Sequence, residues 1–284
     1  AAQGDGRTLA TLVNYACHPT TLAWDNRLVS PDYIGALREV VERDTGAPCL
    51  FIQGASGELG PKEGYVGDVA VADRNGRQVG YATLATLESL APPGTRYEYV
   101  GPVVSGATIG VWRHEPLDAA ARAAKAEWQF TRHIERLPYR PDLPTAQQTA
   151  DELARCGREE EAARAAGDEV RARDFRALAE RQTRMARRLR QLPQGDHYPL
   201  EVRVWRIGDA RFVAVPGEHY SLLQTALRAA RPDTPIVVAT IAQGWGPSYV
   251  PTKETYGRGI YQESIAVVAP GSLEQLIESL LPLL

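Results

Sequence analysis

A histidine closes the first apolar stretch of the chain. Residues 9–16 are apolar enough to form a buried strand, and His18 follows them, fixed by Pro19. Side chains alternate between the two faces of a strand, so Cys17 and His18 should not point into the same site. Imidazole is the commonest metal ligand, whereas a cysteine can be buried as a small apolar group. The pattern therefore makes His18 a candidate metal ligand, with a purely structural histidine as the alternative.

A carboxylate follows a second apolar strand. The strand predicted over residues 211–215 leads into a Pro-Gly pair and then Glu218. Strand ends are where α/β folds build their sites, and a carboxylate oxygen is a zinc ligand. Glu218 can also begin the next helix, whose N-terminal end favours acidic residues. His219, its neighbour, either supports the site or is exposed.

A loop rich in glycine, proline and aromatic residues follows the strand predicted over residues 236–241. It runs from 243 to 261 and contains Tyr249 and Tyr261. Loops of this kind after a buried strand commonly carry function. For either tyrosine, aromatic packing is the alternative interpretation.

Taken in order, these stretches resemble the neutral/alkaline non-lysosomal ceramidases. That family has a His-Pro-Thr strand end, a Ser-Gly-Asp element, a Pro-Gly-Glu after a strand, and two tyrosines twelve residues apart. The matching residues in this chain are His18-Pro19-Thr20, Ser30-Pro31-Asp32, Pro216-Gly217-Glu218, and Tyr249 with Tyr261. The resemblance spans roughly residues 9 to 265 and is weakest over 145–192.

The resemblance implies a zinc-dependent hydrolase that cleaves the amide bond of N-acylsphingosine or a related N-acyl lipid by attack of a metal-activated water. Zinc lowers the pKa of bound water to about 7. In this family two His, one Glu and one Tyr hold the metal. His18 resembles the second His, Glu218 the Glu and Tyr249 the Tyr. Tyr261 resembles the catalytic tyrosine that assists at the metal, and Asp32 is assigned to substrate binding.

Two departures from the family pattern affect these expectations. The family's first zinc His lies upstream of the matched stretch, so we expect the chain to be incomplete at its N-terminus. If a further ligand lies within the chain, His219 and Cys17 are the first candidates. The family's Gly-Asp-Val-Ser-Pro turn corresponds to residues 57–61, and Gly60 takes the place of the reaction-centre Ser. We therefore assign Gly60 to the substrate site and expect weak or absent ceramide hydrolysis.

Two alternatives stay open at this point. One is a zinc hydrolase acting on a different amide or ester. The other is a non-catalytic binding protein on the same fold. The resemblance leaves the location of the protein undetermined; it is compatible with a secreted or periplasmic protein whose signal lies upstream.

The elements that must position these residues alternate between strand and helix, which predicts a layered α/β domain with a mixed sheet. We expect a single catalytic domain over 1–284 with a helical insertion over 115–192. Apart from the strands at 9–16, 211–215 and 236–241, the predicted elements are helices 31–43, 76–90, 117–137, 145–166, 168–192, 221–230 and 273–284, and strands 48–52, 97–109 and 201–207. Ser30 is the expected N-cap of the first helix, and the hairpin of two long helices turns at Gly167.

Composition narrows the classes of partner. The chain has 284 residues and a net charge of -3, so it lacks the cationic footprint of a nucleic-acid-binding protein. Its arginine-rich segment, 164–190, also contains acidic residues and is interpreted as a solvated helical face. Three widely spaced cysteines give no disulfide framework, and no apolar run reaches the length of a transmembrane helix. The expected partner is a small-molecule or lipid amide, with a peripheral membrane contact left open.

Overall fold

The predicted layered α/β architecture with mixed sheets is confirmed. The computed structural model describes residues 7–284. A central four-stranded sheet has the strand order β5-β6-β7-β9, in which β7 and β9 are parallel and the other pairs antiparallel. A second, parallel pair is β1 and β2. The bounds are β1 (Thr11–Tyr15), β2 (Cys49–Gln53), β5 (Trp128–Pro138), β6 (His197–Ile207), β7 (Ala210–Ala214) and β9 (Ile236–Ala239).

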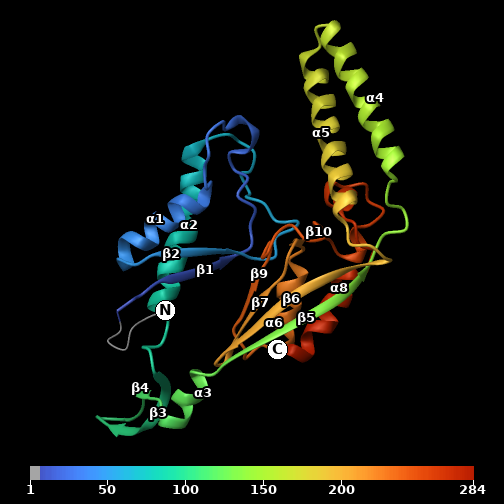
Figure 1. The fold of residues 1–284 in the computed structure, drawn as a ribbon. Coiled ribbons are helices and arrows are strands. Elements are labelled where there is room, and N and C mark those ends of the chain that lie inside the picture. Colours follow the sequence, from blue (N-terminus) through green and yellow to red (C-terminus); the bar gives the residue numbers. More distant parts are fainter. Residues whose placement is uncertain (1–6) are drawn as a thin grey trace.

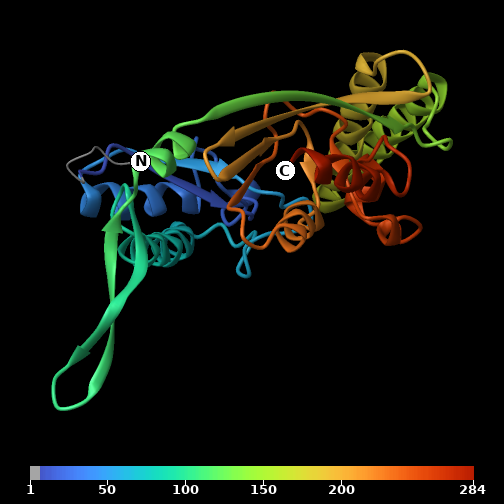
Figure 2. The ribbon, with the colours of Figure 1, turned by 90° about the horizontal axis from the view of Figure 1, so that it is seen from below.

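Two helices cover one face of the central sheet, as Figures 1 and 2 show. They are α6 (Leu222–Ala230) and α8 (Ser272–Leu280). Strand β6 turns alternate residues toward them, because side chains alternate along a strand. The buried core between these layers includes Leu200, Val202 and Val204 from β6, Leu223 and Leu227 from α6, and Leu273, Leu276 and Leu280 from α8.

The parallel pair β1–β2 has its own two helices, α1 (Tyr33–Thr45) and α2 (Val69–Glu88). Their close approach depends on glycines in α2. A Cβ at Gly76 would lie 2.1 Å from the backbone oxygen of Tyr33, and one at Gly80 would lie 2.9 Å from Cβ of Val40. These positions therefore need glycine for the two helices to pack as they do.

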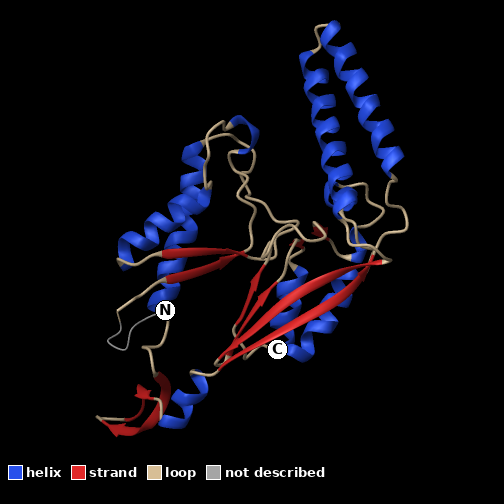
Figure 3. Cartoon of the chain, in the orientation of Figure 1, coloured by secondary structure: helices blue, strands red, loops and turns tan. Residues whose placement is uncertain are grey.

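The predicted helical hairpin is confirmed as α4 (Ala146–Ala165) and α5 (Glu169–Gln191). Thr145 and Gln148 form a reciprocal capping box at the start of α4. Between the helices Gly167 has φ +72°, and the Asp168 side chain caps α5. Figures 1 and 3 show that the hairpin projects away from the sheet, so only its base meets the rest of the molecule.

One predicted helix is wrong over much of its length. Residues 117–137 contain only the short helix α3 (Ala119–Lys125), after which β5 pairs with β6 along its whole length. The run of alanines favours a helix at the start of the segment. The aromatic and β-branched residues that follow, including Trp128, Phe130 and Ile134, favour a strand. The helical insertion expected over 115–192 therefore contains a strand, β5, which belongs to the central sheet. The helical hairpin itself begins at Ala146.

The start of α1 also differs from the prediction. Asp32, rather than Ser30, is the N-cap, and Ser30 Oγ accepts a hydrogen bond from the backbone of Asp32. The β structure predicted over 97–109 is a hairpin that stands away from the layers in Figure 2. Its strands and the remaining short elements are β3 (Thr95–Val104), β4 (Thr108–Pro116), η1 (Ala23–Asp25), β8 (Glu218–His219), β10 (Tyr249–Val250), η2 (Lys253–Thr255), α7 (Tyr261–Ile265) and η3 (Leu281–Leu283). Across residues 7–284, no helix has the length and apolar character needed to cross a membrane.

Candidate metal centre

Three side chains expected to be metal ligands meet at one point beside the strand ends. Nε2 of His18 lies 2.9 Å from Oε2 of Glu218, which is 200 positions away in the sequence. The hydroxyl of Tyr249 lies 3.5 Å from the same nitrogen. The fold thus brings together donor atoms from three separate segments.

The pairing of two very short strands places Glu218 beside Tyr249. Strands β8 and β10 are parallel, and in their register Glu218 is directly opposite Tyr249. The backbone N–H of Glu218 donates to the carbonyl of Ser248 at 2.8 Å. Gly217 permits this approach, because it has φ +93° and a Cβ there would lie 2.8 Å from the Ser248 oxygen. The positive φ and the close contact with Ser248 therefore explain why glycine precedes Glu218.

A loop carbonyl sets the orientation of the His18 ring. Nδ1 of His18 donates to the carbonyl oxygen of Leu59 at 3.0 Å, and the backbone N–H of His18 donates to the same oxygen at 2.9 Å. With its proton on Nδ1, the neutral ring has a lone pair on Nε2. The nitrogen facing Glu218 is therefore the one able to bind a metal.

The arrangement fits a cation held between His18 and Glu218. A lone pair on Nε2 would repel the carboxylate oxygen that faces it, and a proton or a metal ion between them removes the repulsion. The protonated form of His18 is stabilised here, because the hydrogen bond with Glu218 raises the pKa of His18, although burial opposes the shift. Glu218 is only 8% exposed, so a cation there is weakly screened by water.

The donor set is compatible with zinc. Among the described residues 7–284, no group of three or more His, Cys, Asp and Glu side chains is placed to share a metal ion. The donors that converge are therefore one imidazole, one carboxylate and the phenol of Tyr249, all of which zinc accepts. Burial raises the pKa of Tyr249, and the charge of Glu218 raises it further. This phenol consequently stays protonated unless a cation approaches it.

Tyr261 lies beside Tyr249 at the start of α7. The two rings meet edge to face with their centroids 5.9 Å apart. The guanidinium of Arg181 lies over the ring of Tyr261, 5.8 Å from its centroid. Tyr261 is 52% exposed, so its hydroxyl is accessible to a bound molecule.

These groups line a pocket of about 810 Å³. Its walls include His18, Glu218 and both tyrosines, together with Trp245 and the C-terminal part of α5. Clefts of this size are typical of small-molecule sites. The three arginines that α5 contributes, Arg184, Arg187 and Arg188, were not among the predicted site residues. Their spacing of three and four positions in the sequence could have indicated a common helix face.

Two residues assigned to substrate binding lie outside the lining of this pocket. Asp32 is buried, and its carboxylate accepts hydrogen bonds from the backbone N–H groups of Leu22 and Tyr33. Its place at the helix cap therefore gives it a structural function. Gly60 is exposed in the turn just after Leu59, and a Cβ there would meet only Thr20 Oγ1, at 3.8 Å.

The two suggested substitutes for a further ligand point elsewhere. His219 is fully buried, so of its two alternatives the exposed one is wrong. Burial lowers the pKa of His219 to about 4, and neither ring nitrogen has a hydrogen-bond partner in residues 7–284. Cys17 is buried as expected, and burial raises the pKa of its thiol to about 11. Neither residue lines the pocket around His18.

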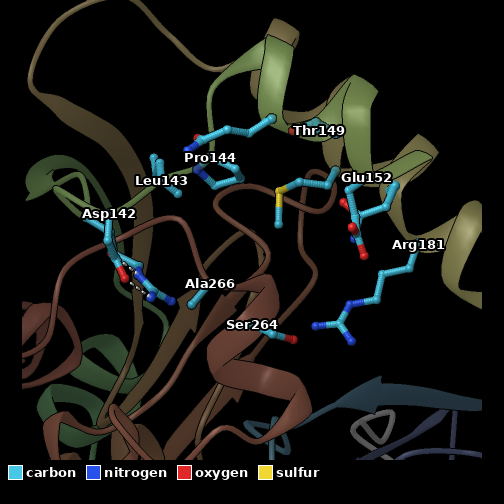
Figure 4. Close-up of a pocket in the computed structure, with 12 residues that line it drawn as sticks. Asp142, Leu143, Pro144, Thr149, Glu152, Arg181, Ser264 and Ala266 are labelled. Carbon is cyan, nitrogen blue, oxygen red and sulfur yellow. Dashed lines mark hydrogen bonds and ion pairs between the residues drawn. The ribbon is translucent and has the colours of Figure 1, made fainter. Parts of the chain in front are cut away.

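A second, smaller pocket of about 330 Å³ lies at the base of the helical hairpin. Figure 4 shows its walls: Asp142, Leu143 and Pro144 lie on one side, and Arg181 extends from α5 toward Ser264 on another. His18, Glu218 and Tyr249 take no part in it. Arg181, whose guanidinium also contacts Tyr261 in the larger pocket, lies between the two.

Fold and site together define an α/β layered domain with a His-Glu-Tyr cluster at its strand ends. The solved structure of neutral ceramidase from Pseudomonas aeruginosa is similar to it, with a TM-score of 0.51 and 16% identity, over 99% of this chain and 44% of that one. A structure described as ceramidase complexed with C2 has a TM-score of 0.52 and 17% identity, over 99% of this chain and 45% of its own. This chain therefore shares the ceramidase fold and spans less than half the length of those chains. No family model and no curated protein matches the sequence.

Proposed function

We propose that this domain is a ceramidase-like, zinc-dependent amide hydrolase acting on an N-acyl lipid or a related N-acyl compound. The observation that carries the proposal is the convergence of His18, Glu218 and Tyr249 on one point in a substrate-sized pocket. The similarity of the fold to solved ceramidases supports the same reaction class.

In this proposal the three convergent side chains hold the metal. Zinc supplies a Lewis acid that polarises an amide carbonyl and lowers the pKa of water. The carbonyl of Leu59 keeps Nε2 of His18 directed at the metal position, in the way that outer groups commonly orient ligating imidazoles. The partial burial of the site limits access of bulk water.

The remaining pocket residues bind the substrate. Tyr261 presents an exposed hydroxyl next to Tyr249, and we assign to it a hydrogen bond to the oxyanion that develops on the carbonyl. Trp245, Leu192 and Ile265 offer an apolar surface to an acyl chain. Gly60, which lies outside this lining, offers no hydroxyl to the site, and this disfavours ceramide itself as the substrate.

Metal content and amide hydrolysis test the proposal together. Purified protein is loaded with zinc, gel-filtered and analysed for zinc per chain, and a fluorogenic N-dodecanoyl anilide with no net charge reports hydrolysis. We expect one zinc per chain and measurable turnover for the full-length natural protein. Glu218→Gln should lose both, because an amide oxygen is a weaker ligand than a carboxylate.

The matched control is Glu39→Gln, which makes the same change at an exposed position on α1. It should keep natural zinc content and turnover. Full zinc occupancy and turnover in Glu218→Gln would reduce Glu218 to a structural residue and contradict the proposal.

A further inference from the structure

One face of α5 presents positive charge to the pocket that contains His18 and Glu218. Arg184, Arg187 and Arg188 line it, followed by Gln191. Residues at positions i, i+3, i+4 and i+7 share a helix face, so the four side chains form a continuous stripe. Against three arginines the pocket lining has a single carboxylate, that of Glu218.

Two of these arginines have no acidic partner. Arg184 lies 3.6 Å from Glu180, with both side chains well exposed. Within residues 7–284, Arg187 and Arg188 make no ion pair. Arg187 is exposed, and the Nη1 atom of Arg188 donates to the Met185 sulfur at 3.9 Å. Arg188 is also partly buried, and burial lowers the pKa of its guanidinium, although the nearby Tyr261 and Glu218 oppose the shift. A partly buried cation without a partner is costly, so a partner is expected to come from outside the chain.

Stabilisation of the helix end does not explain the stripe. Basic residues in the last turn of a helix interact favourably with its negative end. Arg188 and Arg190 both occupy that turn of α5, Arg190 from an exposed position outside the pocket, whereas Arg184 and Arg187 precede it. Helix stabilisation would not require the arginines to gather on the pocket side. Their common feature is that they face the space beside the candidate metal centre.

Part of the remaining pocket lining is apolar. Leu192, Trp245 and Ile265 line it together with the two tyrosines of the site. A molecule that fills the pocket therefore meets an apolar surface and a cationic stripe at once. A neutral N-acyl amino-alcohol would leave the cationic stripe unpaired.

We propose that the substrate of this site is an N-acyl compound bearing an anionic group, a carboxylate or a phosphate, which Arg187 and Arg188 bind while the acyl chain lies against the apolar walls. This inference rests on the proposed amide hydrolase function. Guanidinium groups suit it because they bind carboxylate and phosphate oxygens through paired hydrogen bonds.

The test measures binding rather than turnover. Three ligands share one acyl chain and one amide: N-dodecanoylglycine, N-dodecanoylethanolamine and its O-phosphate. Calorimetry on the full chain, freed of metal by a chelator, gives Kd for each below its critical micelle concentration. We expect at least one anionic ligand to bind about tenfold or more tightly than the neutral one, as expected for a hydrogen bond to a charged group. The tighter of the two anionic ligands identifies carboxylate or phosphate as the group recognised.

Two charge-removing variants locate the effect. The double variant Arg187→Gln/Arg188→Gln should remove the preference for the anionic ligand and leave Kd for the neutral ligand within about twofold. Arg190→Gln, a change of the same kind two positions away, should keep the preference. Equal affinity for all three ligands, or an equal loss of preference in Arg190→Gln, would overturn the inference.

The two proposals fail in different ways. If anionic ligands bind with the expected preference and no amide is cleaved by the zinc-loaded protein, the pocket recognises anions and the hydrolase function is wrong. If the neutral fluorogenic amide is cleaved and no anionic preference is measured, the hydrolase function stands and the substrate class proposed here is wrong.

Discussion

At the scale of single residues, the carbonyl of Leu59 determines what His18 can do. It accepts a hydrogen bond from the Nδ1–H group of His18, so that Nε2 faces Glu218. Leu59 belongs to the turn that follows β2, and Gly57 in the same turn donates to the carbonyl of His219 at 2.8 Å. A Cβ at Gly57 would lie 2.9 Å from the Glu218 carbonyl. The turn thus packs against β8 and aligns the two candidate ligands.

Gly60 gives a test of substrate range. On the proposed function, ceramide hydrolysis should be weak, because glycine stands where the ceramidases that the sequence resembles have a serine. A side chain fits at this position, since a Cβ would meet only Thr20 Oγ1 at 3.8 Å, so Gly60→Ser should change stability by no more than about 0.5 kcal/mol. We expect Gly60→Ser to raise kcat/KM for ceramide. Gly60→Ala adds the same Cβ without the hydroxyl and should not raise it; ceramide hydrolysis by the natural chain at the rate of Gly60→Ser would show that the serine is dispensable.

Tyr261 can be tested by removing its hydroxyl alone. Tyr261→Phe keeps the ring that contacts Tyr249 and lies under Arg181, so zinc content and fold should be unchanged. Loss of one oxyanion donor lowers kcat by about 10²–10³. The measurement is steady-state kinetics of the zinc-loaded protein on the fluorogenic amide. A kcat equal to that of the natural protein would assign Tyr261 to packing.

At the scale of elements, replacing a helical glycine by alanine should have opposite effects on stability in α2 and α4. Gly76 in α2 has no room for a Cβ, which would lie 2.1 Å from the Tyr33 oxygen, whereas Gly157 in α4 has nothing within 4 Å. Gly76→Ala should lower the free energy of unfolding by about 1–3 kcal/mol through overpacking. Gly157→Ala should raise it by about 0.5–1 kcal/mol, because alanine favours a helix. Urea unfolding measures both, and stabilisation by Gly76→Ala would show that α1 and α2 can move apart freely.

The cap of α1 gives a second stability test. Asp32 accepts from the backbone N–H groups of Leu22 and Tyr33. Asp32→Ala should therefore cost about 0.5–2 kcal/mol, as for other N-caps. It should leave binding of the N-dodecanoyl ligands unchanged, because Asp32 does not line the pocket. If Asp32→Ala lost ligand binding but kept normal stability, Asp32 would be a substrate-binding residue.

Elements with strong local signals were predictable from the sequence. The hairpin of α4 and α5 is marked by Thr145, Gly167 and Asp168, which act locally as caps and turn. Strand β5 was missed because it is stabilised by its partner β6, a pairing across some seventy positions of sequence that a local pattern does not reveal.

In the candidate site, too, residues in local motifs were predictable from the sequence, and residues brought in by tertiary packing were not. His18, Glu218 and Tyr249 are candidate ligands through short motifs that resemble the ceramidase pattern, and such motifs can be matched from sequence alone. The arginines of α5 were interpreted as a solvated face, because nothing local in residues 164–190 shows that the base of the hairpin lies over the pocket. The same limit applies to Asp32, whose motif was matched but whose partners are set by the approach of Leu22.

At the scale of the whole molecule, the site depends on how two halves meet. His18 follows β1, whereas Glu218 and Tyr249 belong to the part that contains the central sheet. Strand β9 forms the boundary: the backbone N–H of Thr240, just after it, donates to the carbonyl of Gln53 at the end of β2. The distance between the candidate ligands is therefore fixed by contacts across this boundary.

Asn14 is the side chain that spans this boundary most directly. Its Nδ2 donates to the carbonyl of Ile52 at 3.1 Å and to that of Val238 at 2.9 Å, and its Oδ1 accepts from Arg228 at 3.2 Å. Asn14→Ala removes all three bonds and should cost about 1–3 kcal/mol of unfolding free energy, because it leaves backbone carbonyls unsatisfied. It should also weaken zinc binding, since His18 and Glu218 would no longer be held in register. Asn26→Ala, at a half-buried loop residue whose side chain bonds to Leu28, is the control and should change neither quantity. Urea unfolding and zinc titration of both variants make the comparison; natural zinc affinity in a destabilised Asn14→Ala would show that the metal centre is assembled without help from this boundary.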